Sequence, residues 1–189
     1  MIGENSSRML QNYIDRELVD IPPLPDHLLH VCEMAKRNTA SAGEIVRLTA
    51  ALPKATNKTL KYLNSRFIGL PREITSISHA IEVVGMHTVA TVYTAYSIQM
   101  QLASPSDRVF AIQSEIWIRS CVMASLACRL SKAKMLPPAA TEAAFSGGML
   151  ANIGQIFLLN RFSGPYMEII RRAEQSESDL VDVETELLG

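Results

Sequence analysis

The sequence has few cysteines and no pattern that would pair them. Three cysteines occur among 189 residues, at positions 32, 121 and 128, and none belongs to a Cys-x-x-Cys motif. This odd count argues against a disulfide framework and against a zinc knuckle. On a helix, Cys121 and Cys128 would lie about 10 Å apart, which exceeds the reach of a disulfide. We therefore expect buried free thiols in a reducing compartment.

The chain also lacks long apolar runs and a strong charge of either sign. No stretch approaches the roughly 20 apolar residues of a membrane-spanning helix. The first seven residues are polar, unlike a signal peptide. Lys and Arg total 18 against 19 Asp and Glu, so the net charge of −1 does not indicate a nucleic-acid partner. We expect a cytoplasmic protein without a membrane segment.

Strand signals are missing, whereas helical periodicity runs through the chain. There is no convincing alternation of apolar and polar residues and no Asn-Gly or Asp-Gly hairpin pair. Apolar residues recur at spacings of three and four in two stripes. The first comprises Met86, Val89, Tyr93, Tyr96 and Met100, and the second Ile112, Ile116, Met123, Leu126 and Leu130. The second stripe would also place Arg119 on an apolar face.

This periodicity predicts an all-α fold, a compact bundle of about ten helices with no significant sheet. The predicted helices span residues 7–19, 25–37, 42–51, 53–64, 76–84, 86–101, 106–133, 138–145, 149–161, 165–175 and 180–188. Residues 1–17 would form an N-terminal lead-in and residues 18–189 the domain itself.

Local chemistry marks several of the predicted helix ends. Ser41 and Glu44 match a capping box. The segment Ser104-Pro105-Ser106-Asp107 suggests an N-cap followed by a proline in the first turn. Gly85 can end a helix in the left-handed conformation. The pair Gly147-Gly148 indicates a tight connection or close helix packing rather than a phosphate-binding loop, since no strand precedes it.

Charge is distributed unevenly along the chain. Between Ile45 and Arg72 there are six basic residues and no acidic one, and between Ala173 and Gly189 there are six acidic residues and no basic one. The lysines Lys54, Lys58 and Lys61 stand at i, i+4 and i+7, so they share one helix face. That face could bind an anion or a partner, or it could be an ordinary solvated surface. The acidic segment is typical of an amphipathic surface helix.

No constellation of residues indicates an active site. The motifs Gly-x-Ser-x-Gly and Gly-Lys-Ser/Thr are absent. His27 and His30 could share a helix face, but no third metal ligand accompanies them. His79 and His87 fall in separate predicted helices and are expected at or near the surface. We therefore predict no catalytic residues, no metal and no cofactor.

Several short segments nevertheless occur in a recognisable order. They are Ile21-Pro22-Pro23-Leu24-Pro25, Leu60 to Phe67 with the pair Asn64-Ser65, Ile74 to Ile81 followed by Val84-Gly85, Trp117-Ile118-Arg119-Ser120, Ala144 to Leu150, and Ile153-Gly154. Together, from about residue 18 to the end, they resemble the HDOD family, the HD-related output domains of bacterial signalling proteins. Asn64, Ser65, Gly85 and Trp117 carry the family signature. Local chemistry assigns Asn64 and Ser65 a structural role, capping backbone groups after a helix.

The resemblance implies an all-α fold related to the HD metal-dependent phosphohydrolases, which hold a divalent metal with one His and a His-Asp pair. These positions fall on Arg119, Ala151 and Asn152. An arginine stays protonated and repels a cation, an alanine has no lone pair, and an asparagine has no charge. The resemblance therefore implies no HD-type hydrolysis. We hypothesise that the Arg119 guanidinium fills the place of the lost cation and hydrogen-bonds Asn152.

The resemblance favours a non-catalytic signal-transduction module that acts through protein–protein interaction in the bacterial cytoplasm. The lysine face of Lys54, Lys58 and Lys61 is the expected docking surface for a protein partner. The resemblance does not decide whether the chain forms a homo-oligomer. One alternative is an HD-superfamily phosphohydrolase acting on a cyclic nucleotide or another phosphate ester. A second is a nucleic-acid-binding regulator that uses the same lysines. Family members commonly continue beyond a similar C-terminal segment, so we also expect an apolar face left uncovered.

Overall fold

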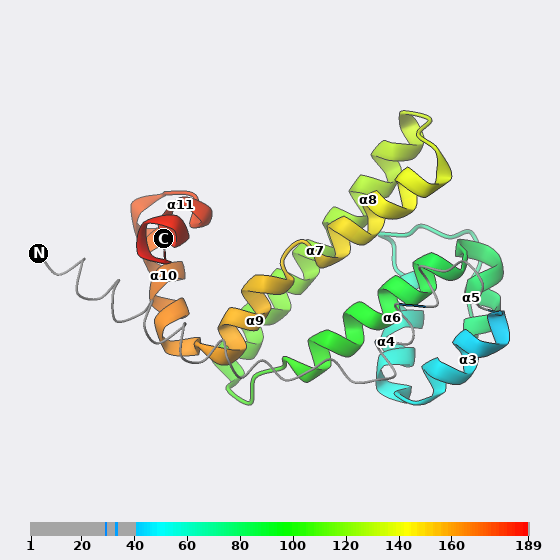
Figure 1. Ribbon diagram of the computed structural model, residues 1–189, viewed down its shortest axis with the longest axis horizontal. Helices are drawn as coiled ribbons and strands as arrows, with labels where there is room; N and C mark the ends of the chain where they lie inside the picture. The colour runs from blue at the N-terminus through cyan, green and yellow to red at the C-terminus, as the bar shows by residue number, and fades with distance from the viewer. Residues whose placement is uncertain (1–28, 30–32, 34–40, 189) are drawn as a thin grey trace, which may run out of the picture. The chain divides into compact units, whose positions relative to one another are not determined.

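The structure, a computed structural model, describes Leu29, Glu33 and residues 41–188 (Figure 1). Its helices are α3 (Ala42–Ala50), α4 (Pro53–Leu63), α5 (Ile77–Val84), α6 (Met86–Gln101), α7 (Asp107–Ala133), α8 (Pro138–Leu150), α9 (Ile153–Arg161), α10 (Ser163–Ser176) and α11 (Leu180–Leu188). No strand occurs in the described part of the chain, so the predicted all-α class is confirmed. The described helices are fewer than the ten or so predicted. The predicted lead-in and the helix at 7–19 lie outside the described residues, as does the helix at 25–37 except for Leu29 and Glu33. His27, His30 and Cys32 also lie outside them.

The described helices belong to two compact units. Helices α3 to α8 and the start of α9, up to Ile156, form the first unit. The rest of α9, from Phe157, belongs with α10 and α11 to the second. The predicted helix boundaries in both units agree with the structure to within about two residues, except around residues 145–153.

Capping chemistry explains where several helices begin. Ser41 Oγ accepts a hydrogen bond from the Glu44 backbone N–H at 3.3 Å, and the Glu44 carboxylate accepts one from the Ser41 N–H at 2.8 Å, which confirms the capping box. Gly85 has a φ of +87° and separates α5 from α6, as its position predicts. Helix α7 begins at Asp107, with Ser106 as N-cap but without a side-chain cap bond. The predicted helix 106–133 is therefore right to within one residue at its start, but the expected N-cap at Ser104 is wrong by two residues.

Helix α6 lies at the centre of the first unit and packs against α3, α4, α5 and α8. Its residues Val89, Val92 and Tyr93 are fully buried. The Tyr93 hydroxyl donates to the carbonyl of Leu48 in α3 at 3.2 Å. Polar side chains inside the helices bond to their own backbone, as Ser97 does to the Tyr93 carbonyl at 2.8 Å. The burial of Val89 and Tyr93 agrees with the first predicted stripe, and the polar groups remain satisfied.

The predicted apolar stripe of α7 is wrong for most of its length. Ile116 is buried, but Met123, Leu126 and Leu130 are 41%, 53% and 63% exposed. The buried face of α7 instead carries Trp117 and a set of small or weakly polar residues: Ser120, Cys121, Ala124, Ser125 and Ser131. Periodicity selects the largest apolar residues, whereas close helix packing selects small ones.

At Ala124, the reason for a small residue is the close approach of α8. A Cβ atom placed on Gly148 would lie 2.6 Å from the backbone nitrogen of Ala124 and 2.7 Å from its Cα atom. The sequence pattern predicts a helix end at residue 145 and a new start at 149, but α8 runs through both glycines to Leu150 and α9 begins at Ile153. Of the two roles considered for the glycine pair, Gly148 therefore has the packing role.

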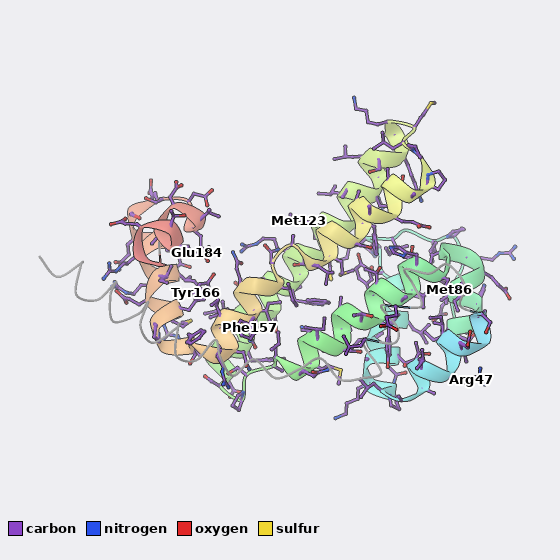
Figure 2. The ribbon with its side chains drawn as sticks, viewed as in Figure 1. Arg47, Met86, Met123, Phe157, Tyr166 and Glu184 are labelled. Atoms are coloured by element: carbon purple, nitrogen blue, oxygen red, sulfur yellow. The ribbon has the colours of Figure 1, made fainter. Side chains whose placement is uncertain are left out.

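The second unit contains the helical pair α10 and α11. Tyr166 on α10 donates a hydrogen bond from its hydroxyl to the Glu184 carboxylate on α11, and the two side chains face each other in Figure 2. Burial and this bond raise the pKa of the Tyr166 hydroxyl, which therefore stays protonated. Val183 is buried, whereas Asp182 and Glu186 are exposed. Helix α11 is thus the amphipathic acidic helix that the sequence predicts.

By length and composition alone, one described helix, α7, could cross a membrane. The indication is weak, because 44% of its most apolar 18-residue stretch is buried inside the protein, as in a core helix.

The glycine contact gives a matched pair of variants. We expect Gly148→Ala to lower the free energy of unfolding by about 1–3 kcal/mol, because the new methyl group meets the α7 backbone and forces the helices apart. A Cβ atom on Gly147 would meet no other part of the protein within 4 Å, so Gly147→Ala should be neutral or should stabilise α8 by up to about 1 kcal/mol. Urea denaturation followed by circular dichroism measures both. Equal stability of the two variants would contradict the packing role.

Candidate functional site

The three positions that the resemblance assigns to metal ligands come from two segments of the first unit. Arg119 lies in the middle of α7, and Ala151 and Asn152 form the break between α8 and α9. The Asn152 amide donates to Ser120 Oγ at 3.0 Å and to Met123 Sδ at 3.7 Å. The fold therefore brings the break next to the α7 turn that contains Arg119.

The expected hydrogen bond between Arg119 and Asn152 is wrong. The Asn152 amide is directed to Ser120 and Met123 instead, and Arg119 is exposed to solvent. The prediction depended on an inward-facing stripe on α7, and that stripe is exposed beyond Ile116. An exposed guanidinium keeps its hydration and needs no buried partner.

The residues at this site do not fit a divalent metal. Arg119 brings a positive charge and Ala151 brings no donor atom. Asn152 uses its amide N–H as a donor to Ser120, which turns the nitrogen end of the side chain toward α7. Among residues 41–188, no three His, Cys, Asp or Glu side chains gather as metal ligands would.

Asn64 has a clear structural role. Its amide donates to the carbonyl of Ile74 at 2.7 Å and its carbonyl accepts from the Ile74 N–H at 2.7 Å. This pair of hydrogen bonds from side chain to backbone closes the segment between α4 and α5, as a neighbouring strand would. The neighbouring Ser65 hydroxyl is buried without a hydrogen-bond partner in the described part of the protein.

Trp117 belongs to an aromatic cluster between α4, α6 and α7. Its ring centre lies 4.9 Å from that of Tyr96, which in turn makes an edge-on contact with Tyr62 at 6.3 Å. The Tyr62 hydroxyl donates to the Cys121 carbonyl at 3.0 Å, and burial raises its pKa to about 12. Burial likewise raises the pKa of the Cys121 thiol to about 11, so both groups stay neutral at physiological pH. The cluster is a packed core rather than a reactive site.

The lysine face borders a surface cavity of about 440 Å³. Its walls are formed by Lys54, Asn57, Lys58, Lys61, Gln99, Met100, Ala103 and Phe110. Lys58 donates to Gln99 Oε1 at 3.2 Å, and its ammonium lies 5.7 Å from the centre of the Tyr96 ring. Partial burial lowers the pKa of Lys58, while Lys54 and Lys61 are exposed. The cavity thus offers three cations and an apolar wall, and none of its lining residues is acidic.

The structure also shows two features that the sequence analysis missed. Two adjoining cavities of about 300 and 220 Å³ share Val84, Thr88, Cys128, Lys132 and Phe145. Between α6 and α8, Ser146 Oγ lies 3.1 Å from His87 Nε2 and 3.0 Å from Thr91 Oγ1. These contacts join residues that are far apart in the sequence: Ser146 and His87 are separated by 59 positions. No local motif could therefore reveal them.

The fold and the two meeting segments place the chain in a known structural class. The crystal structure of a protein from Shewanella amazonensis SB2B, named as a candidate metal-dependent phosphohydrolase, superposes with a TM-score of 0.61 and 16% sequence identity. The match covers 97% of this chain but 65% of that one, so the neighbour is considerably longer. At this identity the likeness shows the shared fold alone.

The family follows from the sequence match. The HDOD domain family model matches residues 21–189, and the chain therefore belongs to the HDOD family, as the order of its short segments predicts. No curated protein matches the chain significantly.

Asn64 and Ser65 provide a second matched pair. We expect Asn64→Ala to lower the free energy of unfolding by about 2 kcal/mol, because it leaves the buried N–H and C=O groups of Ile74 unpaired. Ser65→Ala should change stability by less than about 0.5 kcal/mol, since the hydroxyl has no partner to lose. Thermal unfolding of both variants measures the difference. A small loss for Asn64→Ala would favour a partner-binding role for this residue instead.

Proposed function

We propose that the protein is a non-catalytic HDOD output module of bacterial signal transduction that acts by binding a protein partner in the cytoplasm. The observation that carries this proposal is which residues occupy the three positions that the resemblance assigns to metal ligands. The two segments still meet, since Asn152 bonds to Ser120, but the three ligand positions hold Arg119, Ala151 and Asn152. A fold that keeps this arrangement of helices without the metal ligands favours binding of a protein partner over hydrolysis.

The lysine face is the docking surface we propose. Lys54 and Lys61 are exposed, and Lys58 is held in place by Gln99 and the Tyr96 ring. Exposed cations attract an acidic partner over a distance, whereas the apolar wall at Met100 and Phe110 provides area to bury on contact. This chemistry suits a protein segment that carries acidic residues next to an apolar side chain.

A metal-dependent phosphohydrolase is the second candidate, favoured by the fold of the Shewanella amazonensis SB2B protein. That likeness concerns the scaffold, and catalysis needs ligands that this chain lacks at the corresponding positions. A nucleic-acid-binding regulator would use the same three lysines, without enough exposed aromatic rings beside them to stack bases.

Restoring the ligands tests the non-catalytic assignment. We expect the wild-type chain to bind Mn²⁺ weakly and to leave bis(p-nitrophenyl) phosphate unhydrolysed. The triple variant R119H/A151H/N152D should bind Mn²⁺ more tightly by at least about tenfold, because it returns imidazole and carboxylate donors to segments that already meet. Isothermal titration and elemental analysis measure binding. Tight metal binding with phosphodiester turnover by the wild-type chain would establish the phosphohydrolase instead.

Charge reversal tests the docking surface. We expect K54E/K61E to lower the capture of cellular protein partners by about tenfold or more, because attraction at the cavity becomes repulsion. The matched control is K132E/K134E, which makes the same charge change on exposed lysines outside this cavity. Mass spectrometry of proteins retained by each immobilised variant measures the effect. Equal retention by both variants would contradict the proposal, and salt-dependent binding of duplex DNA by the wild type would indicate a nucleic-acid partner.

A further inference from the structure

One row of side chains runs along the face of α7 opposite its buried side. Its seven members are spaced four, three, four, four, three and four residues apart, which keeps them on one line of the helix. Six are exposed and the central one is half-buried. The row consists of Ala111, Glu115, Ile118, Val122, Leu126, Arg129 and Ala133.

This row is symmetric about Val122. Counting outward from Val122 in both directions, Ile118 matches Leu126 four residues away, and Glu115 matches Arg129 seven residues away. The outermost positions, eleven residues away, are both alanine. Each pair thus combines two apolar side chains or two opposite charges. A surface that complements itself in this way is what a twofold-symmetric interface requires.

We propose that this face binds a second copy of the chain through antiparallel packing of α7 against α7. In an antiparallel pair with its twofold axis at Val122, Ile118 of each copy faces Leu126 of the other. Ile118 is 56% exposed, so the contact removes a substantial apolar area from water. A parallel pair would set Glu115 against Glu115, so the charges select the antiparallel direction.

The charged ends of the row are arranged for such a contact. Arg129 donates from Nη2 to the Phe67 carbonyl at 3.1 Å, which orients the guanidinium while its remaining N–H groups are left for a carboxylate. Glu115 is exposed, and its carboxylate makes no hydrogen bond or ion pair with another described residue of its own chain. On one helix, residues 115 and 129 are about 21 Å apart, so they can pair only between two molecules.

A charge swap tests the proposal directly. We expect the purified wild-type chain to show a monomer–dimer equilibrium in sedimentation velocity at micromolar concentration. E115R should weaken the dimer by about tenfold, because it places two arginines opposite each other at both ends of the seam. R129E should do the same, and E115R/R129E should restore the wild-type constant. Since the two residues of one chain cannot meet, this rescue requires the antiparallel dimer.

A second variant and two controls complete the test. V122E places two carboxylates on the twofold axis and should abolish the dimer, whereas Met135→Glu, beyond the end of α7, should leave it unchanged. K54E/K61E should also leave it unchanged, so loss of partner capture and loss of the dimer are independent results. A wild-type chain that stays monomeric overturns the proposal. Binding of that monomer to anionic lipid vesicles would assign the exposed face of α7 to a membrane surface instead. A dimer that survives V122E overturns it as well.

Discussion

The close contact between α7 and α8 is the constraint on which the rest of the first unit depends. Gly148 approaches the backbone of Ala124 so closely that no side chain fits between the two helices. This approach explains why Ala124 on the buried face of α7 is small, while the larger Met123 and Leu126 beside it are exposed. It also places the end of α8 beside α7, so that Asn152 in the following break reaches Ser120.

The residues that make this contact differ from those at the expected ligand positions. The contact between the helices needs a glycine at position 148, whereas the resemblance assigns the metal ligands to positions 119, 151 and 152. These are different residues, so the residues at 119, 151 and 152 can vary while the helices keep their places. An exposed arginine at 119 and an asparagine bonded to Ser120 are compatible with the fold but not with a bound cation. The two binding surfaces that we propose, the lysine face and the outer face of α7, do not include these three positions.

Local signals predicted the helices well, and contacts between distant helices limited the prediction elsewhere. The Ser41–Glu44 box and Gly85 act on neighbouring backbone groups, so their effect follows from a few residues. The glycine pair at 147–148 misled the assignment because it suggested a turn, whereas one glycine serves packing within a continuous helix. The second predicted stripe, on α7, gave the wrong buried face because helical periodicity contains no information on how closely the next helix approaches. The partner of Asn64, ten residues away, and that of Lys58, 41 residues away, had no sequence signal.

The amino-acid sequence by itself determined the helical class, most helix ends and the family, because each of these follows from residue types at short spacing. Only the tertiary structure decided which face of α7 is buried, that Asn152 bonds to Ser120 rather than to Arg119, and that Lys54, Lys58 and Lys61 border a cavity with an apolar wall. The physical reason is distance. Caps and periodicity act within a few residues along one helix, whereas burial and side-chain pairing depend on how closely helices from distant parts of the chain approach one another.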